Sequence, residues 1–201
     1  MVNGGILLIV IAIVIGVFTV WQIIDTVSNH MWQQQGIRNF PFIHKGKVFW
    51  YSRSVSIVLF TFCRDADGDW CVLANKRGRA SYGAEGLWNA PCGYLDFDES
   101  GEECAQRETF EETGIMVHNK DVKLIGLDTH PEANKQNITI RYYAILDGTV
   151  DEYTPTSEYA EPNEVLEIKW IKIPDIKNYQ WAFNHNTLID SISEKLKLKK
   201  Q

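Results

Sequence analysis

Charge of either sign is missing from the first part of the chain: Val2 to Ile24 contains no charged residue, and Ile6 to Trp21 is almost wholly apolar. A helix of this length spans about 34 Å, enough for a hydrocarbon core of about 30 Å. A cleaved signal peptide is the alternative, but the segment lacks the preceding Lys or Arg and the following small-residue site that cleavage requires. We therefore expect an uncleaved transmembrane anchor over residues 1–24, which contacts the lipid bilayer through residues 4–24.

Lys and Arg are absent before this apolar segment, whereas Arg38, Lys45 and Lys47 follow it. This bias predicts a single-pass membrane protein whose catalytic domain is cytoplasmic. Residues 25–46 are expected to form a juxtamembrane connector. Residues 47–201 are long enough for one further domain.

The four cysteines of the chain include no pair at the C-x₂-C spacing of a thiolate metal site. Cys63 and Cys71 flank a predicted hairpin and are expected to lie close together, as reduced thiols in a cytosolic domain. A basic stripe is missing too, and the net charge is −6, so we expect no nucleic-acid partner. The sequence shows no internal repeat and leaves the formation of an oligomer open.

Basic residues are almost absent between Asp96 and Glu112, a segment with eight Asp or Glu but only Arg107. Glu108, Glu111 and Glu112 are spaced i, i+3 and i+4, which puts three carboxylates on one face of a helix. Like charges at this spacing destabilise a helix unless a hard cation such as Mg²⁺ or Mn²⁺ neutralises them. A solvated acidic helix is the alternative, but such a helix would mix lysines among its glutamates. The pattern therefore predicts a metal site.

The helix that carries these carboxylates has clear end signals. Ser100 followed by Glu103 matches a capping box, and Gly114 stands where a glycine commonly ends a helix. Arg107 lies four residues before Glu111, so the two side chains are expected to pair.

The stretch from Gly93 to Ile115, GYLDFDESGEECAQRETFEETGI, resembles the Nudix box, which marks hydrolases of nucleoside diphosphates linked to another moiety. Cys92 stands where a second glycine is common in that family, and Thr109 where an aliphatic residue is usual. The matching positions are Gly93, Glu99, Arg107, Glu108, Glu111, Glu112, Gly114 and Ile115.

The resemblance implies a role for each of these polar groups. Metal ligands would be the Gly93 carbonyl with Glu108, Glu111 and Glu112, and Glu99 and Arg107 would orient them. Catalysis would involve Glu111, Glu112 and an acid from a loop before a late strand. Glu164 is our candidate for that acid and Glu161 the reserve, while a surface loop charge is the alternative interpretation of Glu164.

The expected chemistry is hydrolysis of a pyrophosphate bond in a small-molecule nucleotide, with Mg²⁺ (or Mn²⁺) activating water and a carboxylate taking its proton. Pro131 lies 16 residues after the box, a distance that the family associates with ADP-ribose pyrophosphatases. Two alternatives remain open. One is a house-cleaning nucleoside triphosphate pyrophosphohydrolase, and the other is a non-catalytic, membrane-tethered nucleotide sensor.

Substrate contacts are less clearly marked in the sequence. Lys76, Arg77 and Arg79 precede the box and are interpreted either as phosphate contacts or as solvated loop charges. Trp88 is a candidate for stacking on a base, although such an aromatic is more often part of a core.

The pattern of apolar residues predicts a strand-rich domain with two main helices. Val55, Ile57, Leu59 and Thr61 alternate with side chains of the opposite face in a central strand, residues 54–62. Further strands are expected over residues 70–75, 122–129, 137–146 and 165–173, and a last helix from Asn184 or Asn186 to about Lys197. With the Nudix resemblance, this order implies an α/β (α+β) fold in which a mixed sheet is sandwiched between helices, preceded by one transmembrane helix.

Overall fold

The structure is a computed structural model that describes residues 13–23, 39–79, 84–132 and 134–198. The chain divides into two compact units, Met1–Ser52 and Arg53–Gln201.

In the first unit, residues 13–23 form a helix with exposed side chains, and β1 (Phe40–His44) pairs antiparallel with β2 (Lys47–Tyr51). Within the described ranges, no helix combines the length and the apolar character needed to cross a membrane. The rest of the predicted anchor, residues 1–12 and 24, lies outside the described residues. The β1–β2 hairpin spans the predicted boundary between residues 46 and 47, because an apolar run lies on each side of the turn at Lys45-Gly46.

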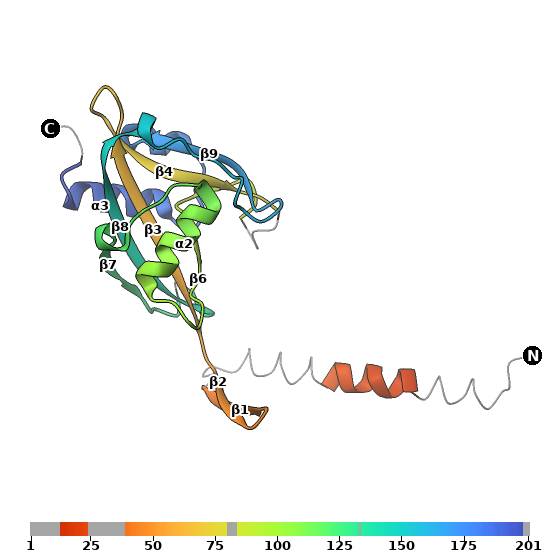
Figure 1. The fold of residues 1–201 in the computed structure, drawn as a ribbon. Coiled ribbons are helices and arrows are strands. Elements are labelled where there is room, and N and C mark those ends of the chain that lie inside the picture. The colour runs from red at the N-terminus through yellow and green to blue at the C-terminus, as the bar shows by residue number, and fades with distance from the viewer. Residues whose placement is uncertain (1–12, 24–38, 80–83, 133, 199–201) are drawn as a thin grey trace, which may run out of the picture. The chain divides into compact units, whose positions relative to one another are not determined.

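The second unit is built on a seven-stranded mixed sheet (Figure 1). The main path through the sheet is β5-β4-β3-β8-β7, with β6 paired to β3 and β9 paired to β4. Only β3 and β8 are parallel among these pairs. The strands are β3 (Ser54–Arg64), β4 (Trp70–Arg77), β5 (Trp88–Asn89), β6 (Cys92–Tyr94), β7 (Lys123–Asp128), β8 (Asn137–Thr149) and β9 (Val165–Lys172).

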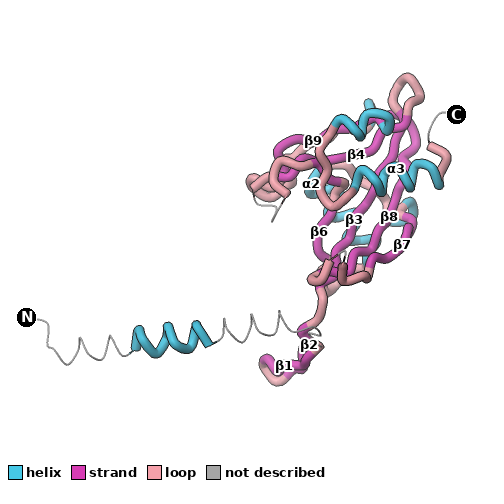
Figure 2. The backbone as a smooth tube through the Cα atoms, turned by 180° about the vertical axis from the view of Figure 1, so that it is seen from behind, coloured by secondary structure: helices cyan, strands magenta, loops and turns pink. Residues whose placement is uncertain are grey.

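One long helix covers each face of this sheet, as the opposite views of Figures 1 and 2 show. Helix α2 (Gly101–Thr113) packs on one face and α3 (His185–Lys195) on the other. The described residues of this unit also form the short 3₁₀ helices η1 (Asn119–Asp121), η2 (Val150–Glu152) and η3 (Ile173–Asn178). The expected sheet between helices is therefore confirmed.

Strand β3 divides the apolar core into two layers. Ile57 and Leu59 face α2, whereas Val58 and Phe60 face α3, and all four side chains are at most 2% exposed. The alternation predicted for this strand is correct, and its central position follows because both of its faces are apolar.

The structure differs from the predicted strands mainly at their ends. Strand β4 continues to Arg77 because β9 supplies paired backbone groups along its whole length. Strands β5 and β6 were not predicted, since two or three residues are too few to show an alternating pattern. Cys63 and Cys71 lie in register across the predicted hairpin, and both are buried free thiols.

Candidate functional site

Helix α2 begins and ends where its sequence predicts. The Ser100 hydroxyl accepts a hydrogen bond from the Glu103 N–H, and the Glu103 carboxylate accepts one from the Ser100 N–H. Gly114 takes a left-handed conformation with φ 71° and donates its N–H to the Phe110 carbonyl. The two caps fix the position of the helix and hence of the glutamates along it.

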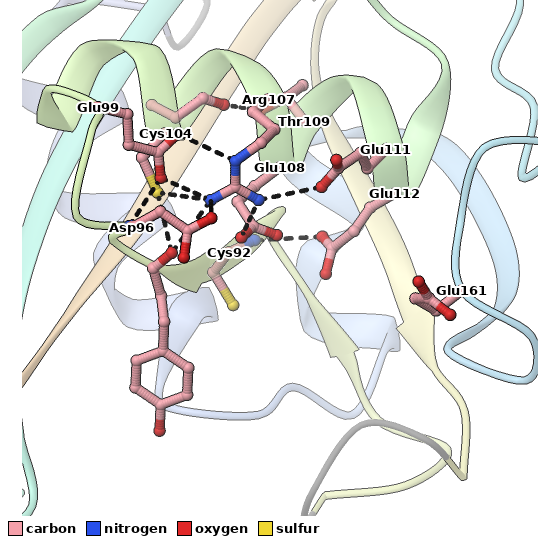
Figure 3. Close-up of polar contacts among 12 residues, drawn as sticks. Cys92, Asp96, Glu99, Cys104, Arg107, Glu108, Thr109, Glu111, Glu112 and Glu161 are labelled. Atoms are coloured by element: carbon pink, nitrogen blue, oxygen red, sulfur yellow. Dashed lines mark hydrogen bonds and ion pairs between the residues drawn. The ribbon is translucent and has the colours of Figure 1, made fainter. Parts of the chain in front are cut away.

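Arg107 is the centre of the polar network on this helix (Figure 3). Its guanidinium donates to Glu99 at 2.7 Å, to Glu108 at 2.8 Å and to Glu111 at 3.0 Å, and also to the Tyr94 carbonyl at 3.1 Å. Because Arg107 donates to Glu99, the pKa of that carboxyl is held at about 2. The network therefore holds Glu99 ionised and orients Glu108 and Glu111.

Gly93 and Glu108 are packed directly against each other. A Cβ at position 93 would collide with the Glu108 carboxylate where it lies, so any other residue would require this side chain to move. Strand β6 is in turn held by pairing with β3, where Gly93 lies opposite Ile57. The glycine thus lets a carboxylate lie against the backbone whose carbonyl is a predicted metal ligand.

Glu112 is buried, with 2% of its surface exposed, and accepts a hydrogen bond from the Cys92 N–H at 3.1 Å. Burial raises its pKa well above the usual value, and the negative charges of Glu108 and Glu164 raise it further. The pKa of Glu108 is also raised, first by burial. The positive charge near Glu108 and Glu112 therefore does not offset the effect of burial on their ionised forms.

The loop before β9 approaches the end of β4. The Gly78 N–H donates to the Glu164 carbonyl at 2.7 Å, and a Cβ on Gly78 would collide with the Asn163 carbonyl. The Glu164 carboxylate accepts a hydrogen bond from the Glu161 N–H at 3.3 Å. Because the charge of Glu164 acts on both Glu108 and Glu112, this loop lies within electrostatic reach of the box. Figure 3 shows Glu161 on the side of the cluster where Glu112 lies.

The donor set suits a hard divalent cation, although it is not arranged as a finished metal site. As the side chains of the described residues lie, no group of three or more His, Cys, Asp or Glu is placed to hold a metal ion. The reason is that Glu108 and Glu111 both turn to the guanidinium of Arg107. All the predicted ligands are oxygens, and the buried Glu112 calls for compensating positive charge, so the residues fit Mg²⁺ or Mn²⁺.

The predicted cationic substrate contacts lie in three different environments. Lys76 is half-buried on β4 opposite Glu167, and Arg79 is exposed and paired with Glu85 at 3.3 Å. Arg77 is only 8% exposed, and its guanidinium lies 4.9 Å from the centre of the Phe183 ring.

Trp88 does not offer a surface for a base. It is 5% exposed and belongs to the core on the α3 side, where its ring meets Tyr179 edge-on at 5.3 Å. Of the two interpretations of Trp88, its burial supports the core, because the pairing of β5 with β4 turns this side chain inward.

Two buried asparagines were missed by sequence reasoning. Asn75 on β4 and Asn89 on β5 lie in register, are at most 1% exposed, and each has an Oδ1 atom without a hydrogen-bond partner among the described residues. The Nδ2 of Asn89 donates to the Ala90 carbonyl at 2.8 Å and lies 3.3 Å from the Cys92 sulfur. An asparagine inside an apolar strand, as in CVLAN, was the available signal.

The chain is similar to a known family and to curated proteins. The family model described as the NUDIX domain matches residues 51–192. Over 106 residues the chain is 34% identical to an isopentenyl-diphosphate Delta-isomerase of Jannaschia sp., a match that covers 52% of this chain and 57% of the isomerase. Over 102 residues it is 29% identical to the NAD-capped RNA hydrolase NudC of Mannheimia succiniciproducens, covering 50% of this chain and 34% of that hydrolase. The chain thus spans less than two thirds of the length of these curated relatives.

Among solved structures, the NUDIX domain of Shewanella oneidensis NrtR complexed with ADP ribose has a TM-score of 0.60 at 21% identity, covering 73% of this chain and 90% of that domain. At this identity the similarity shows the fold. NrtR has also been solved with a 27mer DNA, so the absence of a nucleic-acid partner stays a prediction for this chain.

Proposed function

The chain belongs to the Nudix family, and from this premise we propose that it hydrolyses a pyrophosphate bond in a nucleoside diphosphate linked to another moiety, of the ADP-ribose or nucleotide-sugar type. It is a Nudix pyrophosphohydrolase. The observation that carries the proposal is the convergence of Glu108, Glu111 and Glu112 on one face of α2, within electrostatic reach of Glu164.

The side chains of the site have separable roles. Arg107 and Glu99 orient Glu108 and Glu111, and the Cys92 N–H orients Glu112. Glu108, Glu111, Glu112 and the Gly93 carbonyl would hold Mg²⁺ or Mn²⁺, and the ion would supply positive charge for the phosphoryl oxygens and lower the pKa of a water. Glu164 is the carboxylate that we assign to accept the proton of the attacking water.

A substrate screen tests this proposal. The full chain is incubated with ADP-ribose, NADH, nucleotide sugars, nucleoside triphosphates and isopentenyl diphosphate, in Mg²⁺ and in EDTA. We expect metal-dependent release of a nucleoside monophosphate and a second phosphorylated fragment, detected by mass spectrometry.

The other outcomes separate the alternatives. Release of inorganic pyrophosphate from triphosphates would instead identify a house-cleaning enzyme. Isomerisation of isopentenyl diphosphate would identify an activity like that of the isomerase relative, and NMR would detect it because the mass does not change. Nucleotide binding without any turnover would identify a sensor.

We also propose that residues 4–24 attach the protein to a membrane as a single-pass protein, with the Nudix domain in the cytoplasm. The absence of charge from Val2 to Ile24 supports this proposal. It predicts that the full chain sediments with membranes after a carbonate wash and that added protease reaches the domain only from the cytoplasmic side. A chain recovered in the supernatant would exclude the anchor.

A further inference from the structure

Phe183 has an unusual backbone conformation. Its φ is 57°, in the left-handed region, and Asn184 follows with the same φ of 57°. Asparagine tolerates this region, but a bulky aromatic residue there is an outlier that the surrounding structure must maintain. The result is that the Phe183 ring is held with 55% of its surface exposed.

Hydrogen bonds before and after Phe183 hold residues 180–185 against β5 and the residue that follows it. The Ala182 N–H donates to the Trp88 carbonyl and the Trp88 N–H donates to the Gln180 carbonyl, each at 2.8 Å. Farther along, the Ala90 N–H donates to Nδ1 of His185 at 3.0 Å, and the His185 N–H donates to the Ala182 carbonyl at 3.1 Å. Phe183 is thus fixed to the backbone that leads directly into the Nudix box.

Arg77 connects Phe183 with the candidate site. Its guanidinium lies over one face of the Phe183 ring, 4.9 Å from the centroid. The next residue, Gly78, donates its N–H to the Glu164 carbonyl, so the end of β4 holds both Arg77 and the Glu164 loop.

We propose that Phe183 is the platform on which the base of the nucleotide substrate stacks. This inference rests on the proposed function and deepens it, because it states how the same site holds the base. The face of the ring that meets Arg77 is held in place, and the exposed ring surface is free to pack against a planar group. A side chain that served only the core would be buried, and relaxed backbone would serve it better.

The binding of AMP and of ribose 5-phosphate tests the platform. The two ligands share ribose and phosphate and differ by the base, and neither contains a pyrophosphate bond, so neither is hydrolysed. Calorimetry with the full chain in Mg²⁺ is expected to show that Phe183→Ala weakens AMP binding on the order of tenfold, as for loss of one stacked base. Ribose 5-phosphate should bind equally well to both proteins, and Phe183→Trp should retain AMP binding. Phe97→Ala, at another exposed phenylalanine, is the matched control and should leave both affinities unchanged.

A second variant separates stacking from a structural role. Phe183→Gly suits a φ of 57°, so we expect its melting temperature to equal or exceed that of the parent while its AMP affinity falls. The inference is overturned if the parent binds AMP no more tightly than ribose 5-phosphate, or if Phe183→Ala weakens both ligands equally or neither. Hydrolysis is measured separately in the substrate screen, so a sensor that binds AMP through Phe183 would refute the proposed function and leave the platform standing.

Discussion

At the scale of single residues, the carboxylates of the site differ in how their charges are compensated. Two hydrogen bonds from Arg107 keep Glu99 ionised, with a pKa of about 2. Burial raises the pKa of Glu108 and of Glu112, and the Glu112 carboxylate accepts a hydrogen bond from the backbone N–H of Cys92. Two of the predicted metal ligands, Glu108 and Glu112, are therefore carboxylates whose ionised form burial disfavours, although Arg107 pairs with Glu108.

Glu112→Gln tests whether the buried charge of Glu112 is needed for activity although it does not favour stability. Glutamine keeps an oxygen that accepts the Cys92 N–H but removes a buried charge, so we expect an unchanged or higher melting temperature. We also expect kcat for the preferred substrate to fall by about 10²-fold or more. Calorimetry and steady-state kinetics give the two values. Glu132→Gln, at a glutamate with a side chain that is 90% exposed, should change neither, and normal turnover in Glu112→Gln would contradict its assigned role.

At the scale of elements, the site depends on how α2 is placed relative to β6 and to the loop before β9. The capping box at Ser100 and the left-handed Gly114 set the two ends of the helix, and the missing Cβ at Gly93 leaves room for the Glu108 carboxylate against β6. The hydrogen bond between Gly78 and Glu164 brings in the loop from β9. The loop before β9, which is distant in the sequence, therefore meets α2 and β6 at one set of carboxylates.

Ser100→Ala removes the side-chain half of the capping box. We expect the free energy of unfolding to fall by about 1 kcal/mol, because the Glu103 N–H loses its acceptor at the helix end. Chemical denaturation followed by circular dichroism measures this change. Ser157→Ala, at an exposed serine in a loop, is the control and should have almost no effect. Equal stability of Ser100→Ala and the parent would show that tertiary packing alone holds this end.

At the scale of the whole molecule, α3 and β5 are joined through a buried histidine. His185 is 4% exposed, accepts the Ala90 N–H at Nδ1 and meets the Phe60 ring edge-on at 5.3 Å. Burial lowers its pKa from 6.5 to about 3, so the imidazole stays neutral in the folded protein. His185 therefore resists protonation in the folded chain, whereas in the unfolded chain it takes up a proton at its ordinary pKa.

This difference predicts how stability depends on pH. Below pH 6.5 the unfolded chain takes up a proton at His185, and the folded chain does so only near pH 3. The stabilisation is therefore complete above about pH 6.5 and decreases as the pH falls toward 3. Denaturant unfolding between pH 5.5 and 4 should show a dependence steeper by about 1.4 kcal/mol per pH unit in the parent than in His185→Asn. His130→Asn, at an exposed histidine, should follow the parent, and parallel curves for parent and His185→Asn would refute the prediction.

Features that depend on interactions between residues close in the sequence were predicted well. The caps of α2, the pairing of Arg107 with Glu111 and the alternation along β3 all arise between neighbours a few positions apart, where helix and strand geometry is known in advance. The burial of Trp88 was left open and the conformation of Phe183 was not predicted, because a tryptophan in a two-residue strand and a phenylalanine in a loop have no such local pattern.

By itself, the sequence determined the carboxylate helix, its ends and the apolar order of the central strand, since backbone periodicity and capping operate within a few residues. Only the tertiary structure decided that Trp88 belongs to the core and that Phe183 lies beside Arg77. These relations depend on strand pairing and on contacts between residues up to about a hundred positions apart, and periodicity along the chain contains no information on such contacts.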